Sequence, residues 1–322
     1  SGKSSKVMIV STPHGMNMFY KMWTDAVNKK STFEPIEVHW SEVPGRDEKW
    51  KQETIKNTSE AQFQTEFECE FLGSVDTLIN ASKIKTMPVA TPIRSGGLDV
   101  YEMPISNHIY TMCVDVSRGL SNDYSAFVVL DVTQAPYKIV AKYRNNEIKP
   151  LVFPSVIEKV AKNYNNAFIL VEINDLGQQV ADNLQFELEY DNMMMVTQRG
   201  RSGQVLGGGF SGRGNQLGLR MTKGTKRIGT SNLKSLIEGD KLIINDFDII
   251  SELSTFISKG KSFEAEAGAT DDLVMCLVIF SWLANQRYFK ELTDVDVRGQ
   301  MFADQKNALE ADMAPFGFID NG

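Results

Sequence analysis

The sequence predicts an α/β fold in which a mixed sheet is flanked by helices. Three apolar segments rich in β-branched residues follow one another through short connections, at residues 109–116, 124–132 and 138–145. Short connections between such segments are typical of antiparallel hairpins. A continuous apolar run at residues 167–173 predicts a strand that is buried on both faces. A sheet that begins antiparallel and continues through alternating helices and strands has helices on its faces.

The segments before this sheet predict a smaller, separate part. Residues 6–11 (KVMIVS) predict a buried strand, and the aromatic spacing of residues 19–27 predicts a helix. Residues 50–72 have the pattern of one polar amphipathic helix. Residues 86–106 hold three of the ten prolines and a Gly-Gly pair, which indicates a linker or a loose loop.

The segments after residue 145 alternate between helical and strand patterns. Residues 198–218 are rich in glycine and are predicted to be irregular. Thr270 is predicted to cap a long apolar helix that runs to about Phe289. The other predicted helices are residues 154–164, 178–188, 223–238 and 248–258, and the other strands are residues 193–197, 241–245 and 262–266.

Composition excludes several classes of protein. The 322 residues are 42% hydrophobic and 23% charged, with a formal net charge of −7, as in an ordinary globular protein. Three widely spaced cysteines without a CxxC pair, together with three histidines, argue against a zinc cluster and favour reduced thiols. No apolar run approaches the roughly 20 residues that a membrane helix needs, so no membrane partner is expected.

The first residues resemble the end of a phosphate-binding loop, but the context does not fit. Residues 1–4 read Ser-Gly-Lys-Ser, and a predicted strand follows them where such a loop would open a helix. This chain alone is therefore not expected to hydrolyse ATP. Because the chain starts without methionine and almost directly with a strand, it is expected to be a fragment of a longer polypeptide.

Four carboxylates occupy unusual positions. Asp115 lies between two valines and Glu172 between a valine and an isoleucine in predicted strands, where acids are disfavoured. Asp271 and Asp272 lie at the head of a helix that is apolar nearly all round and must be buried. Acids at a helix N-terminus are common, and an acid at a strand end can simply be paired or solvated. Either acid in a strand is as consistent with that structural role as with a functional one.

Carboxylates without histidine or cysteine select hard divalent cations such as Mg²⁺ or Mn²⁺. Two such ions about 4 Å apart can activate water and stabilise the leaving oxygen of a phosphodiester. Asp123 follows Asp115 across a tight turn and is a possible further ligand, although a turn aspartate explains it equally well.

A basic segment follows the second strand acid. Residues 192–237 contain eight Lys and Arg and no acid, so the rest of the chain carries −15. Such a one-sided run favours contact with a polyanion such as DNA. For residues 200–215 a disordered surface insertion is at least as good an interpretation. The expected phosphate contacts lie on or beside a predicted helix: Arg220, Lys223, Lys226, Arg227 and Lys234.

Three motifs together resemble the nuclease domain of tailed-phage large terminases, particularly those of T-even-like phages. These are CVDVSRGLSNDYSAFVVLD, FILVEINDLGQQVADNL and EAEAGATDDLVMCLVIFSWL. The KVMIVSTPHGMNMFYKMW and FEPIEVHW segments resemble the end of that family's packaging ATPase domain, and GSVDTLIN resembles the junction between the domains. The resemblance implies an RNase H-like mixed sheet preceded by a partial P-loop-type ATPase segment.

The resemblance also implies a division of the chain. Residues 1–73 would be the end of the ATPase domain, 74–107 the junction, 108–292 the nuclease domain, and 293–322 an acidic tail. By motif, Asp115, Glu172 and Asp272 correspond to the catalytic acids, and Asp271 would be an auxiliary ligand. Ser11 and Thr12 match the family's ATPase coupling motif. The glycine-rich stretch around residues 199–215 looks like an insertion to which the family assigns no role.

The activity implied is that of a divalent-metal-dependent endonuclease that cuts concatemeric viral DNA during genome packaging. The resemblance further implies double-stranded DNA, a portal protein and a small terminase subunit as partners, in the host cytoplasm at the prohead portal. ATP would be used only by the full-length protein.

Two alternatives stay open at this level. One is another RNase H-like nuclease such as a junction resolvase, against which the ATPase-like first 70 residues argue. The other is a non-catalytic DNA-binding motor module, in which Asp115 and Glu172 would be structural. Metal-dependent nicking of plasmid would separate the second alternative from both nucleases.

Overall fold

The structure is a computed structural model of the 322-residue chain. It describes residues 6–13, 18–27, 29–71, 76–118, 124–199, 203–207, 215–260 and 262–293. The chain divides into two compact units, each of which is described by itself. The first comprises Ser1–Ala90 and Ile244–Val274, and the second comprises Thr91–Ile243 and Met275–Gly322.

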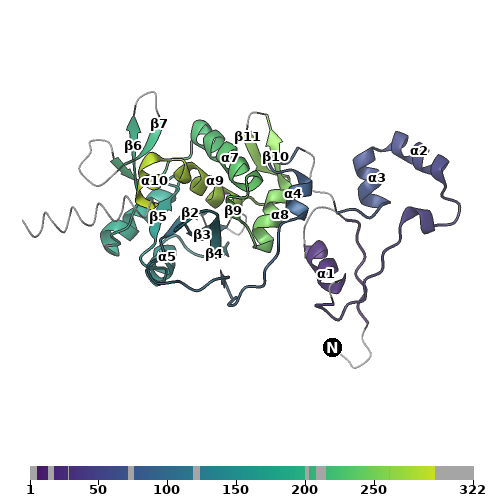
Figure 1. Ribbon diagram of the computed structural model, residues 1–322, viewed down its shortest axis with the longest axis horizontal. Coiled ribbons are helices and arrows are strands. Elements are labelled where there is room, and N and C mark those ends of the chain that lie inside the picture. Colours follow the sequence, from purple (N-terminus) through teal and green to yellow (C-terminus); the bar gives the residue numbers. More distant parts are fainter. Residues whose placement is uncertain are drawn as a thin grey trace, which may run out of the picture. The chain divides into compact units, whose positions relative to one another are not determined.

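The second unit is built on a mixed sheet, as the sequence predicts (Figure 1). Among the described residues the sheet has six strands in the order β1-β4-β3-β2-β5, with β9 beside β4. The pairs β2–β3, β3–β4 and β1–β4 are antiparallel, whereas β2–β5 and β4–β9 are parallel. The strands are β1 (Leu98–Val100), β2 (Tyr110–Asp115), β3 (Ser125–Asp131), β4 (Tyr137–Asn145), β5 (Phe168–Val171) and β9 (Leu242–Ile243).

One face of this sheet packs on two helical segments. Helix α5 (Phe153–Asn163) has proline in its first turn, and α6 (Gly177–Asp182) continues into the π-helical turn η2 (Asn183–Glu187). Val114, Phe127 and Val171 of the strands join residues of α5 and α6 in one buried apolar cluster. These helices are close to their predicted positions because their apolar residues recur at helical spacing.

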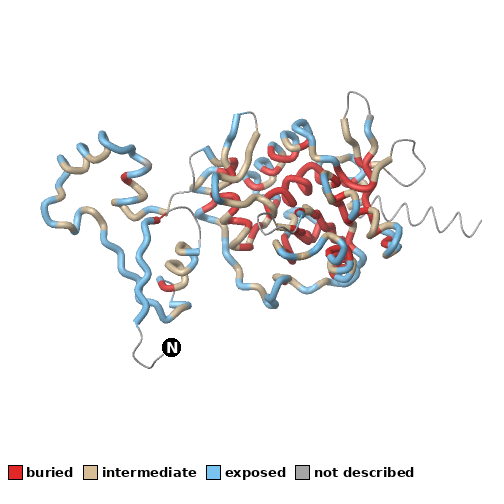
Figure 2. The backbone as a smooth tube through the Cα atoms, turned by 180° about the vertical axis from the view of Figure 1, so that it is seen from behind, coloured by how far each residue is buried: buried red, intermediate tan, exposed pale blue. Residues whose placement is uncertain are grey.

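The opposite face is covered by α7 (Lys223–Glu238) and by the part of α9 (Asp272–Ala284) that follows Val274 (Figure 1). Gly229 lets the two helices approach closely, because a Cβ there would lie 2.6 Å from the carbonyl oxygen of Val278. Phe280 packs edge-on against Tyr137 of β4. The buried positions, red in Figure 2, run through both the sheet and these helices.

The glycine-rich stretch is more ordered than the sequence predicts. Residues 203–207 form strand β7, which pairs with β6 (Met195–Arg199), and β8 (Asn215–Leu217) pairs with the other edge of β6. The prediction of an irregular segment was therefore wrong for β7 and β8. The glycine content hid the strands because backbone pairing with β6 needs no side chains.

The beginning of the first unit departs from the prediction in two places. Residues 6–13 are described without strand pairing, and the apolar side chains of Val7, Met8 and Val10 are exposed. A strand needs a partner, and no described segment of this unit provides one here. The single helix predicted at residues 50–72 is instead two, α2 (Glu48–Asn57) and α3 (Glu60–Glu66), because Ser59 caps the second helix.

Aromatic rings hold this region together. Helix α1 (Met18–Val27) is formed as predicted. Trp40 begins the 3₁₀ turn η1 (Trp40–Glu42), and its ring contacts those of Trp50 and Phe63. Phe63 is fully buried, so α2 and α3 fold around a small aromatic core.

The remainder of the first unit comes from two distant chain segments. Helix α4 (Ala81–Lys85) packs against α8 (Phe247–Thr255), and Leu78 donates a backbone hydrogen bond to Phe256. The hairpin of β10 (Phe256–Lys259) and β11 (Ser262–Ala265) follows α8.

The long C-terminal helix predicted for residues 270–289 is also two helices. Helix α9 ends at Ala284, and α10 (Arg287–Thr293) follows it. Within the described residues no helix is long and apolar enough to span a bilayer. The predicted acidic tail lies almost entirely outside the described residues, which end at residue 293.

Candidate functional site

Asp115 and Glu172 lie side by side at the ends of two adjacent parallel strands. Val114 of β2 is in register with Val171 of β5, and the amide of Glu172 donates to the carbonyl of Val114 over 2.9 Å. Both valines point into the apolar cluster with α5 and α6, so the next residue on each strand faces the opposite side of the sheet. Neighbouring strands are about 4.8 Å apart, so the two half-buried carboxylates share one edge and one face.

The loops beyond these acids are tied to each other. Arg118 and Asp175 each lie three residues after one of the acids, and the guanidinium of Arg118 donates to both oxygens of Asp175, over 2.6 and 3.1 Å. This hydrogen bonding lowers the pKa of the Asp175 carboxyl from its ordinary value. Both side chains are exposed, so the pair orders the loops more than it stabilises the fold.

Two glycines let the backbone close tightly around Glu172. A Cβ at Gly177 would overlap the carbonyl oxygen of Glu172, so the start of α6 can approach this strand end only as glycine. Gly218 has φ +88°, and a Cβ there would lie 2.4 Å from the carbonyl oxygen of Val171. The position of Glu172 is therefore set by backbone contacts on both sides.

The basic segment begins beside Glu172. Leu219 forms a parallel bridge with Glu172, and its amide donates to Val171 over 2.8 Å. The side chain of Asn174 holds the next turn, because its amide group donates to the carbonyl of Met221 and accepts from the amide of Met221. Arg220, between Leu219 and Met221, is therefore held at the edge that carries the two acids, with its side chain exposed.

Gln204 of β7 connects the small sheet to this segment. Its side chain donates to the carbonyl of Arg220 over 2.6 Å and to the hydroxyl of Thr225 over 2.9 Å, and it accepts from the amide of Arg220. The sequence analysis missed both Asn174 and Gln204, because nothing local distinguishes an amide that holds a backbone from one that is solvated.

The other predicted basic residues lie along α7. Lys223 and Arg227 are exposed, and Lys226 is half-buried. Lys234 lies about 16 Å from Lys223 along the helix axis, since each residue rises 1.5 Å. It forms an ion pair with Glu238 at 3.7 Å. The structure thus places the first three near the start of α7 and Lys234 well away from it.

Asp271 and Asp272 lie in the first unit, where α9 begins. Asp272 is the first residue of α9, and a carboxyl oxygen of Asp271 accepts the amide of Ala265 over 3.3 Å. The predicted cap of this helix was wrong: the hydroxyl of Thr270 donates to Glu252.

Glu252 of α8 takes the capping role and was missed by the sequence analysis. Glu252 is 4% exposed, and its carboxylate accepts hydrogen bonds from the amides of Leu273 and Val274, over 2.9 and 3.0 Å. A buried anion at the amides of a first helical turn is stabilised by the free N–H groups and the helix dipole. The available signal was an acid on the apolar face of a helix, between Ile249 and Leu253.

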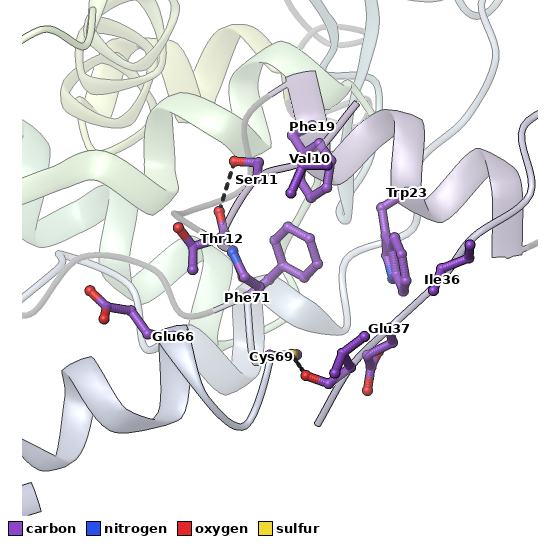
Figure 3. Close-up of a pocket in the computed structure, with 12 residues that line it drawn as sticks. Val10, Ser11, Thr12, Phe19, Trp23, Ile36, Glu37, Glu66, Cys69 and Phe71 are labelled. Atoms are coloured by element: carbon purple, nitrogen blue, oxygen red, sulfur yellow. Dashed lines mark hydrogen bonds between the residues drawn. The ribbon is translucent and has the colours of Figure 1, made fainter. Parts of the chain in front are cut away.

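Asp123 lies outside the described residues. Ser11 and Thr12 lie in the first unit on the wall of a cavity of about 230 Å³ (Figure 3). The hydroxyl of Ser11 donates to the carbonyl of Thr12 over 3.0 Å, and the rings of Phe19 and Phe71 stand nearby in the same wall.

The donor chemistry of the strand-end acids suits a hard cation. Carboxylate oxygens on rigid strand ends are ligands of the kind that Mg²⁺ and Mn²⁺ prefer. The nearest cysteine on β2, Cys113, is fully buried, and burial raises the pKa of its thiol.

Comparison with known families agrees with this geometry. The family model described as "Terminase RNaseH-like domain" matches residues 112–294, and that described as "Terminase large subunit, T4likevirus-type, N-terminal" matches residues 1–86. The chain belongs to the terminase large-subunit family. The first match covers more than half of the chain and includes Asp115, Glu172 and Asp272.

Curated terminases extend beyond this chain. It is 24% identical over 294 residues to the terminase large subunit of Thermus virus P23-45, and 23% identical to that of Thermus phage G20c. In both comparisons the match covers 84% of this chain and 54% of the relative. The chain thus spans about half the length of these terminases.

Solved structures confirm the predicted RNase H-like fold. The large terminase nuclease of thermophilic phage G20c, crystallised with bound magnesium, matches with a TM-score of 0.50 and 20% identity. The match covers 65% of this chain and 97% of that nuclease, and the cobalt-bound form of the same nuclease gives equal values.

Proposed function

We propose that this chain contains the nuclease of a large terminase, a divalent-metal-dependent endonuclease that cuts concatemeric viral DNA during genome packaging. The observation that carries this proposal is that Asp115 and Glu172 directly follow the paired residues Val114 and Val171 of two adjacent strands, on an RNase H-like sheet of a terminase-family chain. The metal-bound nucleases of similar fold support it. The match of residues 1–86 to the N-terminal part of terminases disfavours a junction resolvase.

The proposed metal ligands are Asp115, Glu172 and Asp272, with Asp271 as an auxiliary ligand and Asp123 as a further candidate. Two Mg²⁺ or Mn²⁺ ions are proposed, because a pair activates water and stabilises the leaving oxygen of a phosphodiester when bound. The strand-end pair supports the first two ligands, since β2 and β5 hold both carboxylates on one face. For Asp272, support comes from its place in the first turn of a rigid, buried helix.

Double-stranded DNA is the proposed substrate, and its proposed track starts at Arg220 and follows Lys223, Lys226 and Arg227. The bridge between Leu219 and Glu172 supports this track, because it puts the first cation next to an acid of the proposed metal site. Lys234 is a weaker member, since it pairs with Glu238 further along α7.

The proposed activity is tested by replacing Asp115 with asparagine, which keeps the shape of the side chain and removes its charge. With Mg²⁺ or Mn²⁺ the wild-type chain should nick plasmid DNA, and Asp115→Asn should reduce the rate by at least about a hundredfold, because metal-ion stabilisation contributes several kcal/mol. The fold should survive, since the change relieves repulsion between neighbouring acids.

Asp182→Asn is the matched control, because this half-buried acid lies on α6, on the other face of the sheet. It should cut plasmid at the wild-type rate. Normal cutting by Asp115→Asn in the presence of Mg²⁺ would refute the proposed site, and a wild-type chain that binds Mn²⁺ and DNA without cutting would favour a DNA-binding module.

The proposed DNA track is tested by a double replacement of Lys226 and Arg227 by alanine. Binding to unrelated duplexes should weaken alike, and the slope of log K against log salt should fall by about 0.9 for each lost phosphate contact. Replacing Lys159 and Lys162 on α5 is the control, since both are exposed on the helix that covers the opposite face. Equal loss of affinity in the two double variants would show that binding depends on the total charge of the chain and not on the proposed track.

The larger context is proposed from the family. A longer polypeptide would use ATP through a domain that the first unit helps to complete, with Ser11 and Thr12 as its coupling motif. The portal protein and the small terminase subunit are the proposed partners, in the host cytoplasm at the prohead portal. The exposed apolar side chains of Val7, Met8 and Val10 support such a completion, because they need a partner to be buried.

A further inference from the structure

A row of residues crosses the sheet at the level of the strand-end acids. Asp115 of β2 is in register with Ala126 of β3, and Ala126 is in register with Arg144 of β4. Asp115, Ala126 and Arg144 are chain neighbours of Val114, Phe127 and Tyr143, all of which point into the apolar cluster. The alternation of strand side chains therefore places the three on the opposite face, together with Glu172.

Arg144 lies two strands away from Asp115, so it is near the acids although their strands are not adjacent. Two strand intervals of about 4.8 Å separate Asp115 from Arg144, so their Cα atoms are about 10 Å apart. Between them stands Ala126, which has only a methyl side chain and is fully buried. The long side chain of Arg144 can therefore reach toward the acids over a small neighbour.

The guanidinium of Arg144 makes a cation–π contact. It lies over the ring of Tyr124, with its central carbon 4.6 Å from the ring centroid. The N–H donors of a guanidinium lie in the plane of the group, so they can bind a phosphate with two hydrogen bonds while the ring contacts its face. The contact with Tyr124 restricts this cation before it binds, which lowers the entropy lost on binding.

We propose that Arg144 is a substrate-contact residue of the proposed nuclease, holding a DNA phosphate beside the phosphodiester that lies over Asp115 and Glu172. This inference rests on the proposed function. Two clustered carboxylates repel a DNA strand, and a nearby cation offsets that repulsion. Phosphates along one strand recur about every 3.4 Å of helix axis, so a strand that crosses the row offers Arg144 a phosphate.

The test compares Arg144→Gln with Lys138→Gln in the 322-residue chain. Lys138 lies at the other end of β4, where it is 47% exposed and forms an ion pair with Glu102 at 3.6 Å. Both variants lose one positive charge from the same strand, but only Arg144 lies beside the acids. Plasmid and oligonucleotide cutting with Mn²⁺ give KM and kcat, and metal-free titrations give the salt dependence of binding.

Arg144→Gln should raise KM for duplex DNA by about tenfold and change kcat little, because one charge-assisted contact to the substrate is lost. Its slope of log K against log salt should fall by about 0.9, whereas Lys138→Gln should keep the wild-type values. Arg144→Lys should fall between wild type and Arg144→Gln, since it keeps the charge and loses the planar fork. Unchanged thermal midpoints would show that the variants are folded.

The outcomes separate this inference from the proposed function. If the wild-type chain fails to cut DNA, the proposed function fails, and the metal-free salt slopes still decide the role of Arg144. If Arg144→Gln keeps the wild-type KM and salt slope, the inference is overturned. Equal losses in Arg144→Gln and Lys138→Gln would also overturn it, because they would show a general effect of charge. If Arg144→Gln does not fold, Tyr124→Leu replaces it in the test, because it removes the ring that the guanidinium contacts. Tyr124→Leu should raise KM by a smaller factor than tenfold. An unchanged KM and salt slope in Tyr124→Leu would then overturn the inference.

Discussion

Replacing Glu252 by alanine is expected to loosen the first turn of α9, the turn that carries Asp272. The carboxylate of Glu252 is buried and accepts three hydrogen bonds, from the amides of Leu273 and Val274 and from the hydroxyl of Thr270. These three hydrogen bonds help to hold the start of α9 in place.

The expected size of the effect follows from these contacts. Alanine leaves two buried amides without an acceptor, at about 1–3 kcal/mol each, so the local opening free energy should fall by about 3 kcal/mol. Glu252→Gln keeps a carbonyl oxygen for the amides and loses only the charge. Its cost should be about 1.5 kcal/mol, the sum of a weaker hydrogen bond and a lost interaction with the helix dipole.

Hydrogen exchange of a peptide covering residues 270–278 measures this opening directly. Protection of the first-turn amides should fall about a hundredfold in Glu252→Ala and about tenfold in Glu252→Gln, since 1.4 kcal/mol corresponds to a factor of ten. Metal-dependent cutting should fall in the same order, because this turn carries Asp272, a proposed metal ligand.

Glu264→Ala is the matched control, an acid of the same unit that pairs with Lys259 and is 45% exposed. It should leave both exchange and cutting unchanged, because an exposed ion pair contributes little. Wild-type protection of the first turn of α9 in Glu252→Ala would refute the reasoning.

Two further changes test the stability of the fold. Gly177→Ala should lower the free energy of unfolding, measured by chemical denaturation, by about 3 kcal/mol and abolish cutting, because its Cβ would overlap a backbone carbonyl. Gly224→Ala is the control and should be tolerated, because there is space for a Cβ at this position. Equal stability of the two variants would contradict the argument. Burial raises the pKa of Asp131, but hydrogen bonds from Thr133 and His108 outweigh it and leave that pKa below its ordinary value. The stabilisation by this ionised group is therefore present above about pH 4 and is lost as the pH falls through its lowered pKa. The difference in unfolding free energy between wild type and Asp131→Asn should accordingly be smaller at pH 3 than at pH 6. An equal difference at the two pH values would contradict this prediction.

The sequence predicted most strands and helices of the second unit because their patterns are local. β2, β3 and β4 were recognisable from apolar, β-branched runs, and α7 was predicted at its observed bounds. The errors fell where a local pattern misleads. Strand β7 was hidden by glycines, and residues 6–11 were predicted as a strand from an apolar run whose partner is not among the described residues of the unit.

The candidate acids were also visible in the sequence, because Asp115 and Glu172 interrupt apolar strands. Their proximity could not be deduced from the residues, since it depends on β2 pairing in parallel with β5 in one particular register. A shift of one residue would turn one acid to the other face of the sheet. The contribution of Asp272 stays a prediction that metal binding and cutting assays can test.

By itself the sequence determined the order of the elements, the odd acids in apolar strands and the one-sided charge of residues 192–237. These properties depend on side-chain chemistry and short-range spacing, which any window of the chain displays. Only the tertiary structure decided that Glu252 caps α9, that Gln204 holds Arg220, and that Arg144 shares a row with Asp115. Each of these relations joins segments that are distant in the chain, and such contacts arise from the tertiary packing within each unit rather than from any local pattern.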